Sequence, residues 1–348
     1  MRVTVLAIAF TFLVTGPNAV GGTSKDGEIV SQEACAAKPV GTYEEYVKEF
    51  RASFAEEVSE AKAEGFELHT PSNLDTVIPA RNQFETMKAY KGFECTRLKY
   101  MSDGLQVAAY IWKPSATESK RLPVIIFNRG GRGEFGQIGT SPIWSPWDRF
   151  GFHKFVSSGF VVIASQYRGN DGGEGKEDFG GSDVHDVLNL IPLVRGLSYA
   201  DPKNVFLMGV SRGGMMTYLA LKEGIDVRAA ATIGGAADLL ALMRQRPEMR
   251  IDLMDVVPGL TPQNDVPLVE RSAVYWPERI TVPVLIMAGG SDWRVNPLTN
   301  ALSLATKLQA LRARYELVVY EDDDHGLTMN RADSDARIVR WFKQHMSK

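Results

Sequence analysis

One short stretch of this sequence combines residue types that can perform nucleophilic chemistry. Residues 209–214 read GVSRGG; they follow the apolar run 205–208 and precede the helix-forming run 215–223. A G-x-S-x-G motif between a strand and a helix is typical of a nucleophile elbow, in which a strained backbone exposes the serine hydroxyl. The glycines let the strand and the helix approach, and the helix N-terminus offers N–H groups to an oxyanion. We therefore predict that Ser211 is a nucleophile.

A serine hydroxyl needs a general base, and the base needs an orienting acid. Among five histidines, His325 alone lies on a short loop directly after an apolar strand-like run, residues 316–320. Asp292 follows another such run, residues 282–290, although an aspartate there is also typical of a turn or a helix cap. Loops after the carboxyl ends of strands collect the chemistry of α/β sheets. The chain order Ser211, Asp292, His325 is that of α/β-hydrolases.

Three other acids compete for the place of Asp292. They are Asp322, Asp323 and Asp324, which adjoin the histidine in sequence and cannot easily face its far ring nitrogen. We therefore predict a triad of Ser211, Asp292 and His325.

The elements that must position these residues alternate along the chain. From Pro123 onward, apolar strand-like runs alternate with helical patterns, as in a mostly parallel sheet that helices cover on both faces. Upstream, a hairpin is expected around Asp103-Gly104. The sequence predicts an α/β-hydrolase fold over residues 92–348, with the irregular stretch 236–280 as an insertion over the site.

The N-terminal part of the chain has a different pattern. Residues 1–21 have the layout of a signal peptide, with an apolar run at 3–14 that is shorter than the about 20 residues of a membrane span. We expect a secreted or periplasmic protein that leaves the membrane once the leader is removed. Residues 22–91 are predicted as a helical extension, loose at 23–41 and helical at 41–65. Cys35 and Cys95 either form a disulfide or remain free thiols.

Composition excludes several function classes. The net charge of −3 and the scattered Lys and Arg residues argue against a nucleic-acid partner. No spacing of Cys, His or carboxylates indicates a metal site, and no G-x-G-x-x-G opens a first βα turn. We expect no cofactor and no metal, and a peptide or small ester as substrate. The sequence leaves the oligomeric state open.

Further motifs accompany the elbow in a fixed order. They are Tyr167-Arg168-Gly169 with the glycine-rich tail to 181, Asp183-x-x-Asp186, Gly290-Ser291-Asp292-x-x-Val295 and Asp324-His325-Gly326. Over about residues 92–346 this combination resembles the catalytic domain of the prolyl-oligopeptidase family. The resemblance implies the same triad, an oxyanion donor at the N–H of Arg212, and a second donor from the loop after an early strand.

The sequence departs from that family in two places. Arg129-Gly130-Gly131 stands where members often carry Tyr-Gly-Gly or His-Gly-Gly, so the N–H of Gly131, or else of Gly130, becomes the second donor. Only about 70 residues precede the hairpin, too few for the β-propeller of family peptidases, which implies a more open site.

Three side chains are candidates for substrate contact, each with a structural alternative. Arg129 either contacts substrate or forms a salt bridge, and Tyr167 either contacts substrate or belongs to the scaffold. Trp293, like Trp144, Trp147 and Trp276, either lines a pocket or packs in the core.

The function that these residues predict is that of a serine hydrolase. The first candidate is a peptidase that cleaves short peptides through an acyl-enzyme, for which His325 must protonate the leaving amine. The alternatives are a carboxylesterase with the same triad and a non-catalytic binding protein on this fold. We rank the binding protein last, because all three triad residues are present.

Overall fold

The computed structural model describes residues 25–36, 41–68, 74–115, 120–138 and 152–347. The predicted leader at 1–21 lies outside the described residues. The sequence Ser145-Pro146-Trp147-Asp148 also predicts a helix start, with serine as the cap and proline at the first helical position, and it too lies outside the described residues.

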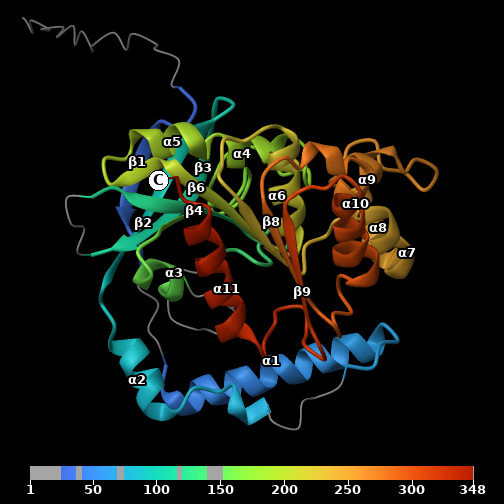
Figure 1. The fold of residues 1–348 in the computed structure, drawn as a ribbon, viewed down its shortest axis with the longest axis horizontal. Helices are drawn as coiled ribbons and strands as arrows, with labels where there is room; N and C mark the ends of the chain where they lie inside the picture. The colour runs from blue at the N-terminus through green and yellow to red at the C-terminus, as the bar shows by residue number, and fades with distance from the viewer. Residues whose placement is uncertain (1–24, 37–40, 69–73, 116–119, 139–151, 348) are drawn as a thin grey trace, which may run out of the picture.

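A single large sheet forms the centre of the molecule (Figure 1). Within the described residues it has nine strands in the order β1-β2-β3-β5-β4-β6-β7-β8-β9. The first three pairings in that order are antiparallel, and all pairings from β5–β4 onward are parallel. The strands are β1 Ile29–Ala34, β2 Phe93–Ser102, β3 Leu105–Pro114, β4 Leu122–Asn128, β5 Val161–Ser165, β6 Ala200–Val210, β7 Ala230–Ile233, β8 Val284–Gly289 and β9 Tyr315–Tyr320. The predicted α/β-hydrolase fold with a mostly parallel sheet is confirmed.

Helices cover both faces of the sheet, because the strands are apolar on both faces. Along β4, Val124 and Ile126 belong to one hydrophobic cluster, while Ile125 and Phe127 belong to the other. The first cluster contains side chains of α4 His185–Leu188, α5 Leu190–Gly196, α6 Arg212–Lys222 and α10 Ser303–Ala310. The second contains side chains of α3 His153–Ser157 and α11 Arg331–Gln344.

The N-terminal segment combines one strand with two helices. α1 spans Tyr43–Ala63 and begins at the N-cap Thr42, which forms a capping box with Glu45, so the helix expected at 41–65 is confirmed. α2 spans Arg81–Ala89. Residues 23–41 are not uniformly loose as expected, since β1 pairs with β2 at the sheet edge. The polar sequence of β1 (IVSQEA) hides this strand, which depends on its partner for hydrogen bonds.

The predicted hairpin joins β2 and β3. Asp103 and Gly104 both have positive φ, at 51° and 78°, as a two-residue type I′ turn requires. Cys35 and Cys95 form a disulfide that links the end of β1 to β2.

Residues 236–280 differ from the expected irregular insertion. They contain α7 Leu239–Gln245, α8 Pro247–Met254 and α9 Val266–Glu270, with short 3₁₀ turns at Ala273–Tyr275 and Pro277–Arg279. The helices are short, and prolines start two of them, so the sequence has little helical periodicity to reveal them.

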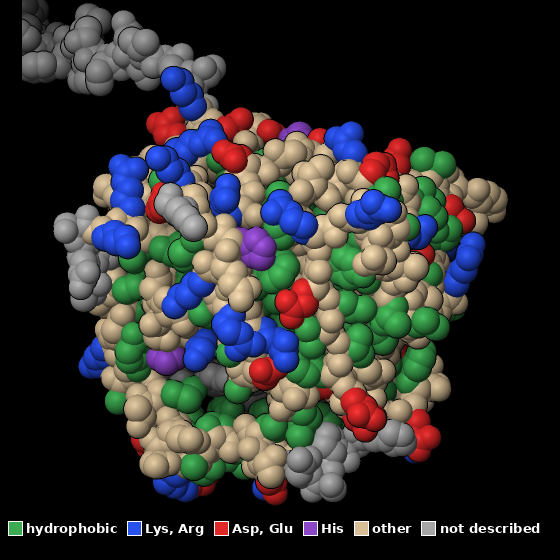
Figure 2. Space-filling view, viewed as in Figure 1, with side chains coloured by type: hydrophobic (Ala, Val, Ile, Leu, Met, Phe, Trp, Pro, Cys, Tyr) green, Lys and Arg blue, Asp and Glu red, His purple; other side chains and the backbone are tan. Residues whose placement is uncertain are grey.

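The surface carries charges of both signs. Figure 2 shows Lys and Arg side chains across the centre and the β1–β3 side of one face, with Asp and Glu interspersed and hydrophobic side chains gathered over α7–α10. Among the described residues, no helix has both the length and the hydrophobicity that crossing a membrane would take.

Candidate active site

Ser211 occupies the corner between β6 and α6. Its backbone has φ 58° and ψ −124°, a strained conformation for a residue with a Cβ. Glycines surround this corner because a Cβ at Gly209 would overlap the carbonyl oxygen of Gly213, and one at Gly213 would overlap that of Asn128. The geometry is that of a nucleophile elbow, in which the hydroxyl leaves the sheet at its carboxyl edge.

His325 and Asp292 meet at the same edge of the sheet. His325 Nδ1 lies 2.7 Å from Asp292 Oδ2, and both side chains are buried. The other carboxylate oxygen of Asp292 accepts the Val295 N–H at 2.9 Å, which restricts the orientation of the carboxylate. Because Asp292 engages Nδ1, Nε2 is the ring nitrogen that is left to act on a substrate or a nucleophile. His325 and Ser211 line one cavity.

The acids next to His325 in sequence build its loop instead of facing its ring. Asp324 accepts the N–H groups of Gly326 and Thr328 and the hydroxyl of Thr328. Asp323 accepts the N–H groups of Asp324, Met329 and Asn330, and burial raises the pKa of its carboxyl. These bonds hold the turn that carries His325 into the cavity.

The loop after β4 runs beside the nucleophile. A Cβ at Gly130 would lie 3.3 Å from the Cβ of Ser211, so the backbone of this loop reaches the serine closely. Gly131 has φ 68°, and a Cβ there would overlap the carbonyl oxygen of Phe135. Within the part of the chain that the structure describes, neither the Gly131 N–H nor the Arg212 N–H has a hydrogen-bond acceptor in the protein. Two unpaired donors beside a nucleophile suit a developing negative charge.

The side chain of Arg129 holds this loop. Its buried guanidinium donates five hydrogen bonds to the carbonyl oxygens of Gly130, Gly133, Phe135 and Gln166. Burial lowers its pKa to about 10, and Glu177 lies 3.9 Å away. Arg129 therefore has a structural role, as the salt-bridge alternative predicted, but backbone carbonyl oxygens are its main partners.

Tyr167 and Trp293 are not among the residues that line this cavity, and their contacts are those of the structural alternatives. Tyr167 is fully buried, its hydroxyl donates to the carbonyl of Arg129, and the guanidinium groups of Arg129 and Arg212 lie 5.2 and 5.0 Å from the centre of its ring. Trp293 is 4% exposed, and the guanidinium groups of Arg246 and Arg294 lie 5.0 and 4.6 Å from the centre of its ring. Trp276 is also buried, and Trp144 and Trp147 lie outside the described residues.

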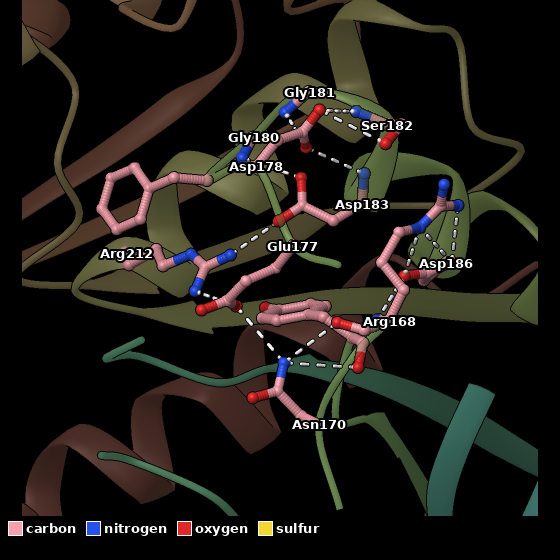
Figure 3. Close-up of polar contacts among 12 residues, drawn as sticks. Arg168, Asn170, Glu177, Asp178, Gly180, Gly181, Ser182, Asp183, Asp186 and Arg212 are labelled. Atoms are coloured by element: carbon pink, nitrogen blue, oxygen red, sulfur yellow. Dashed lines mark hydrogen bonds and ion pairs between the residues drawn. The ribbon is translucent and has the colours of Figure 1, made fainter. Parts of the chain in front are cut away.

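The sequence did not reveal the role of the Arg212 side chain. Its buried guanidinium donates to Glu177 at 2.7 Å and to Asp183 at 2.6 Å (Figure 3). It also donates to the carbonyl oxygen of Gly131 at 2.8 Å. Glu177 also accepts the N–H of Gly133 at 2.7 Å. Asp183 thus pairs with Arg212 in addition to lying at the start of a short helical turn. The network joins the start of α6 to the loop after β4, which carry the two candidate oxyanion donors.

Asp183 makes the stability of this network depend on pH. Burial raises its pKa from 3.8 to about 6, and Arg212 only partly offsets that shift. Since the folded protein holds this proton more tightly than the unfolded chain, the contribution of Asp183 to stability is full below about pH 4 and is lost as the pH rises through about 6. The difference in unfolding free energy between wild type and Asp183→Asn should therefore fall by up to about 3 kcal/mol from pH 4 to pH 7. Urea titrations at each pH measure it, and a difference that grows with pH would contradict the prediction.

The cavity between these elements has a volume of about 620 Å³. Its wall includes the 129–138 loop, the elbow and the His325–Gly326 turn. The insertion contributes both apolar and charged residues, namely Ala236, Leu239, Leu242, Met249 and Leu253 together with Arg246 and Asp252. α1 contributes Ser53, Glu56, Glu57 and Glu60. This size is within the range of pockets that bind small ligands.

Most of this chain is similar to known proteins. Residues 147–348 match the model of the prolyl oligopeptidase family. An uncharacterized peptidase of Bacillus subtilis (strain 168), YtmA, is 29% identical over 248 residues, which are 71% of this chain and 91% of the relative. Acylamino-acid-releasing enzyme 1 of Oryza sativa subsp. japonica is 25% identical over 80% of this chain but only 37% of its own length.

Solved structures show the same fold. The acylaminoacyl peptidase of Pyrococcus horikoshii superposes with a TM-score of 0.64 at 20% identity, over 78% of this chain and 44% of that one. A puromycin-hydrolyzing peptidase of Mycobacterium tuberculosis superposes with a TM-score of 0.60 at 23% identity, over 72% of this chain and 39% of that one. This chain thus spans less than half of each of these two structures. Because the family model covers more than half of the sequence, the chain belongs to the prolyl oligopeptidase family of serine peptidases.

Proposed function

We propose that this chain hydrolyses short peptides through an acyl-enzyme formed on Ser211, with His325 and Asp292 as base and orienting acid. The observation that carries the proposal is the 2.7 Å contact of His325 Nδ1 with Asp292 Oδ2, in a cavity that the strained Ser211 also lines. Each of the three residues taken alone could have a purely structural role, but their convergence at one edge of the sheet supports the assignment of a hydrolase triad.

The reaction follows from these positions. Ser211 Oγ attacks the substrate carbonyl carbon while Nε2 of His325 takes its proton, and Asp292 stabilises the resulting imidazolium. The N–H groups of Arg212 and Gly131 donate to the oxyanion. The Arg212 side chain keeps these two residues close together, because it donates to the carbonyl oxygen of Gly131. His325 then gives its proton to the leaving amine, and a water molecule repeats the cycle on the acyl-enzyme.

Short peptides are the substrate class that the cavity and the relatives favour. The volume of about 620 Å³ suits a few residues and not a folded chain. Relatives named as acylaminoacyl or dipeptidyl peptidases support a peptide with either a blocked or a free N-terminus. A carboxylesterase would use the same residues, because ester cleavage has the same steps with a better leaving group.

A substrate panel separates these outcomes. We expect turnover of dipeptidyl p-nitroanilides or N-acetyl-aminoacyl p-nitroanilides, with the Ser211→Ala variant as the blank. Turnover of p-nitrophenyl esters alone would identify an esterase. A folded protein that cleaves none of these compounds would contradict the proposed function.

We also propose that the protein is exported to an oxidising compartment. The leader-like pattern at 1–21 and the Cys35–Cys95 disulfide support this location, since disulfides persist mainly outside the cytosol. Fractionation of the producing cells, with a thiol count of the purified protein, would test it.

A further inference from the structure

α1 crosses the candidate active site, yet none of the proposed catalytic steps uses it. Figure 1 shows α1 and α2 as a separate layer across the end of the molecule at which α11 begins. Ser53, Glu56, Glu57 and Glu60 recur at i, i+3, i+4 and i+7, so they form one stripe of the helix, and all four line the cavity that holds Ser211. α1 is therefore one wall of the cavity.

One buried carboxylate fastens this helix to the catalytic domain. Glu57 is 2% exposed and accepts the indole N–H of Trp293 at 2.9 Å. It also accepts Nε of Arg294 at 3.0 Å and Nη2 at 2.9 Å, a bidentate pair that fixes direction as well as distance. Glu60 pairs with the same guanidinium. Burial lowers the pKa of Arg294, but its hydrogen bonds with Glu57 and its pairing with Glu60 raise it more, so the cation persists.

Apolar packing supports the same contact. Ala61, Leu68 and Trp293 form a small hydrophobic cluster, with Val58 and Phe66 against it. Among the described residues, the hydrogen bonds and ion pairs that join α1 to any residue beyond 92 come from Glu57 and Glu60. The attachment of α1 to the cavity wall is thus concentrated in about one turn of helix.

The other attachment lies where the segment leaves and rejoins the sheet. The chain leaves β1 at Cys35 and re-enters β2 at Phe93, and the Cys35–Cys95 disulfide cross-links these two ends. α1 and α2 bind mainly each other between them, through Arg81–Glu44 and through Tyr46 against Phe84. The segment between β1 and β2 is therefore attached to the rest of the protein at two places. One is the disulfide, and the other, which we call the catch, is the contact of Glu57 with Trp293 and Arg294.

We propose that α1 limits the length of the peptides that reach Ser211, and that Glu57 is the specificity-determining residue that keeps α1 in place. This inference rests on the proposed peptidase function. With Glu57 engaged, α1 closes one side of a cavity of about 620 Å³, so a long peptide has to displace the helix, whereas a short one fits beneath it. Loss of the catch frees that side without touching Ser211, Asp292 or His325.

The test compares two substrates in three proteins. One substrate is a dipeptidyl p-nitroanilide, and the other is an internally quenched decapeptide with the same two residues before the cut. In Glu57→Ala we expect the ratio of kcat/KM for the decapeptide to kcat/KM for the anilide to rise about tenfold or more above the wild-type ratio. Glu49→Ala is the matched control, since Glu49 is an exposed glutamate two turns away on the same helix, and both of its values should equal those of the wild type.

Hydrogen exchange of the α1 amides gives a readout that does not depend on turnover. Exchange should accelerate in Glu57→Ala, stay at the wild-type rate in Glu49→Ala, and lie between the two in Glu57→Gln, which keeps an acceptor for the Trp293 N–H. Unchanged exchange in Glu57→Ala would overturn the role of Glu57.

Three kinetic results would overturn the inference. The first is an equal change in kcat/KM for both substrates in Glu57→Ala, which would mean that Glu57 supports the Asp292 loop. The second is a fall in kcat/KM for the decapeptide alone in that variant. The third is a wild-type protein that cleaves both substrates equally well. Failure of the wild type to exceed the Ser211→Ala blank on every compound of the substrate panel would instead contradict the proposed function, and hydrogen exchange of α1 would still test the role of Glu57.

Discussion

Replacing Ser211 with alanine should lower kcat/KM for the best substrate of the panel by at least about 10⁴-fold, because the remaining cavity and oxyanion donors supply only a small part of such catalysis. The side chain lost is small and lies at the surface of the cavity, so the fold should persist. Steady-state kinetics with a circular dichroism spectrum check both statements. Residual activity above about 1% in a preparation free of wild type would exclude Ser211 as the nucleophile.

A glycine at the same position separates chemistry from strain. Ser211→Gly should be as inactive as Ser211→Ala, but it relieves the φ 58°, ψ −124° backbone that alanine must keep. We expect the glycine variant to exceed the alanine variant in unfolding free energy by about 1 kcal/mol, after glycine's larger loss of chain entropy is subtracted. Urea unfolding measures the difference. Equal stability would mean that the strain at this corner is no larger than glycine's extra loss of chain entropy.

The second large effect is expected at the orienting acid. In Asp292→Asn the amide can donate to His325 Nδ1, which favours the ring tautomer whose proton sits on Nε2, and this tautomer cannot accept the proton of Ser211. We expect kcat to fall by about 10⁴-fold with little change in KM, because the substrate-binding wall is unchanged. Pre-steady-state and steady-state rates on one substrate measure the two parameters.

Asp322→Asn is the matched control for this variant. Asp322 is an exposed acid three residues before His325, and its φ of 55° suits asparagine as well as aspartate. The kcat of Asp322→Asn should therefore stay within about threefold of the wild-type kcat. A larger fall in Asp322→Asn than in Asp292→Asn would move the acid of the triad to the 322–324 turn.

Local patterns along the chain determined the fold class and the positions of the candidate triad. The apolar runs predicted the strands of the parallel sheet. G-x-S-x-G between the strand-like run of β6 and the helical run of α6 predicted the corner of Ser211. Asp292 and His325 could be chosen because each follows a strand, and parallel strands bring their carboxyl ends to one edge.

Other features depended on partners far away in sequence. A buried aromatic and a pocket aromatic look alike in sequence, so the packing of Tyr167 and Trp293 could not be read from their types. β1 exists because β2 offers it hydrogen bonds, and its own polar sequence gives no sign of a strand.

The sequence by itself determined which groups can react and in what order they occur, because the elbow and the strand ends are local features. The tertiary structure alone decided what surrounds those groups. Arg212 reaches Glu177 and Asp183, which are 35 and 29 residues away, and Glu57 reaches Arg294 across 237 residues. Such pairs form only when the folded chain removes both partners from water together, and sequence spacing carries no record of that contact.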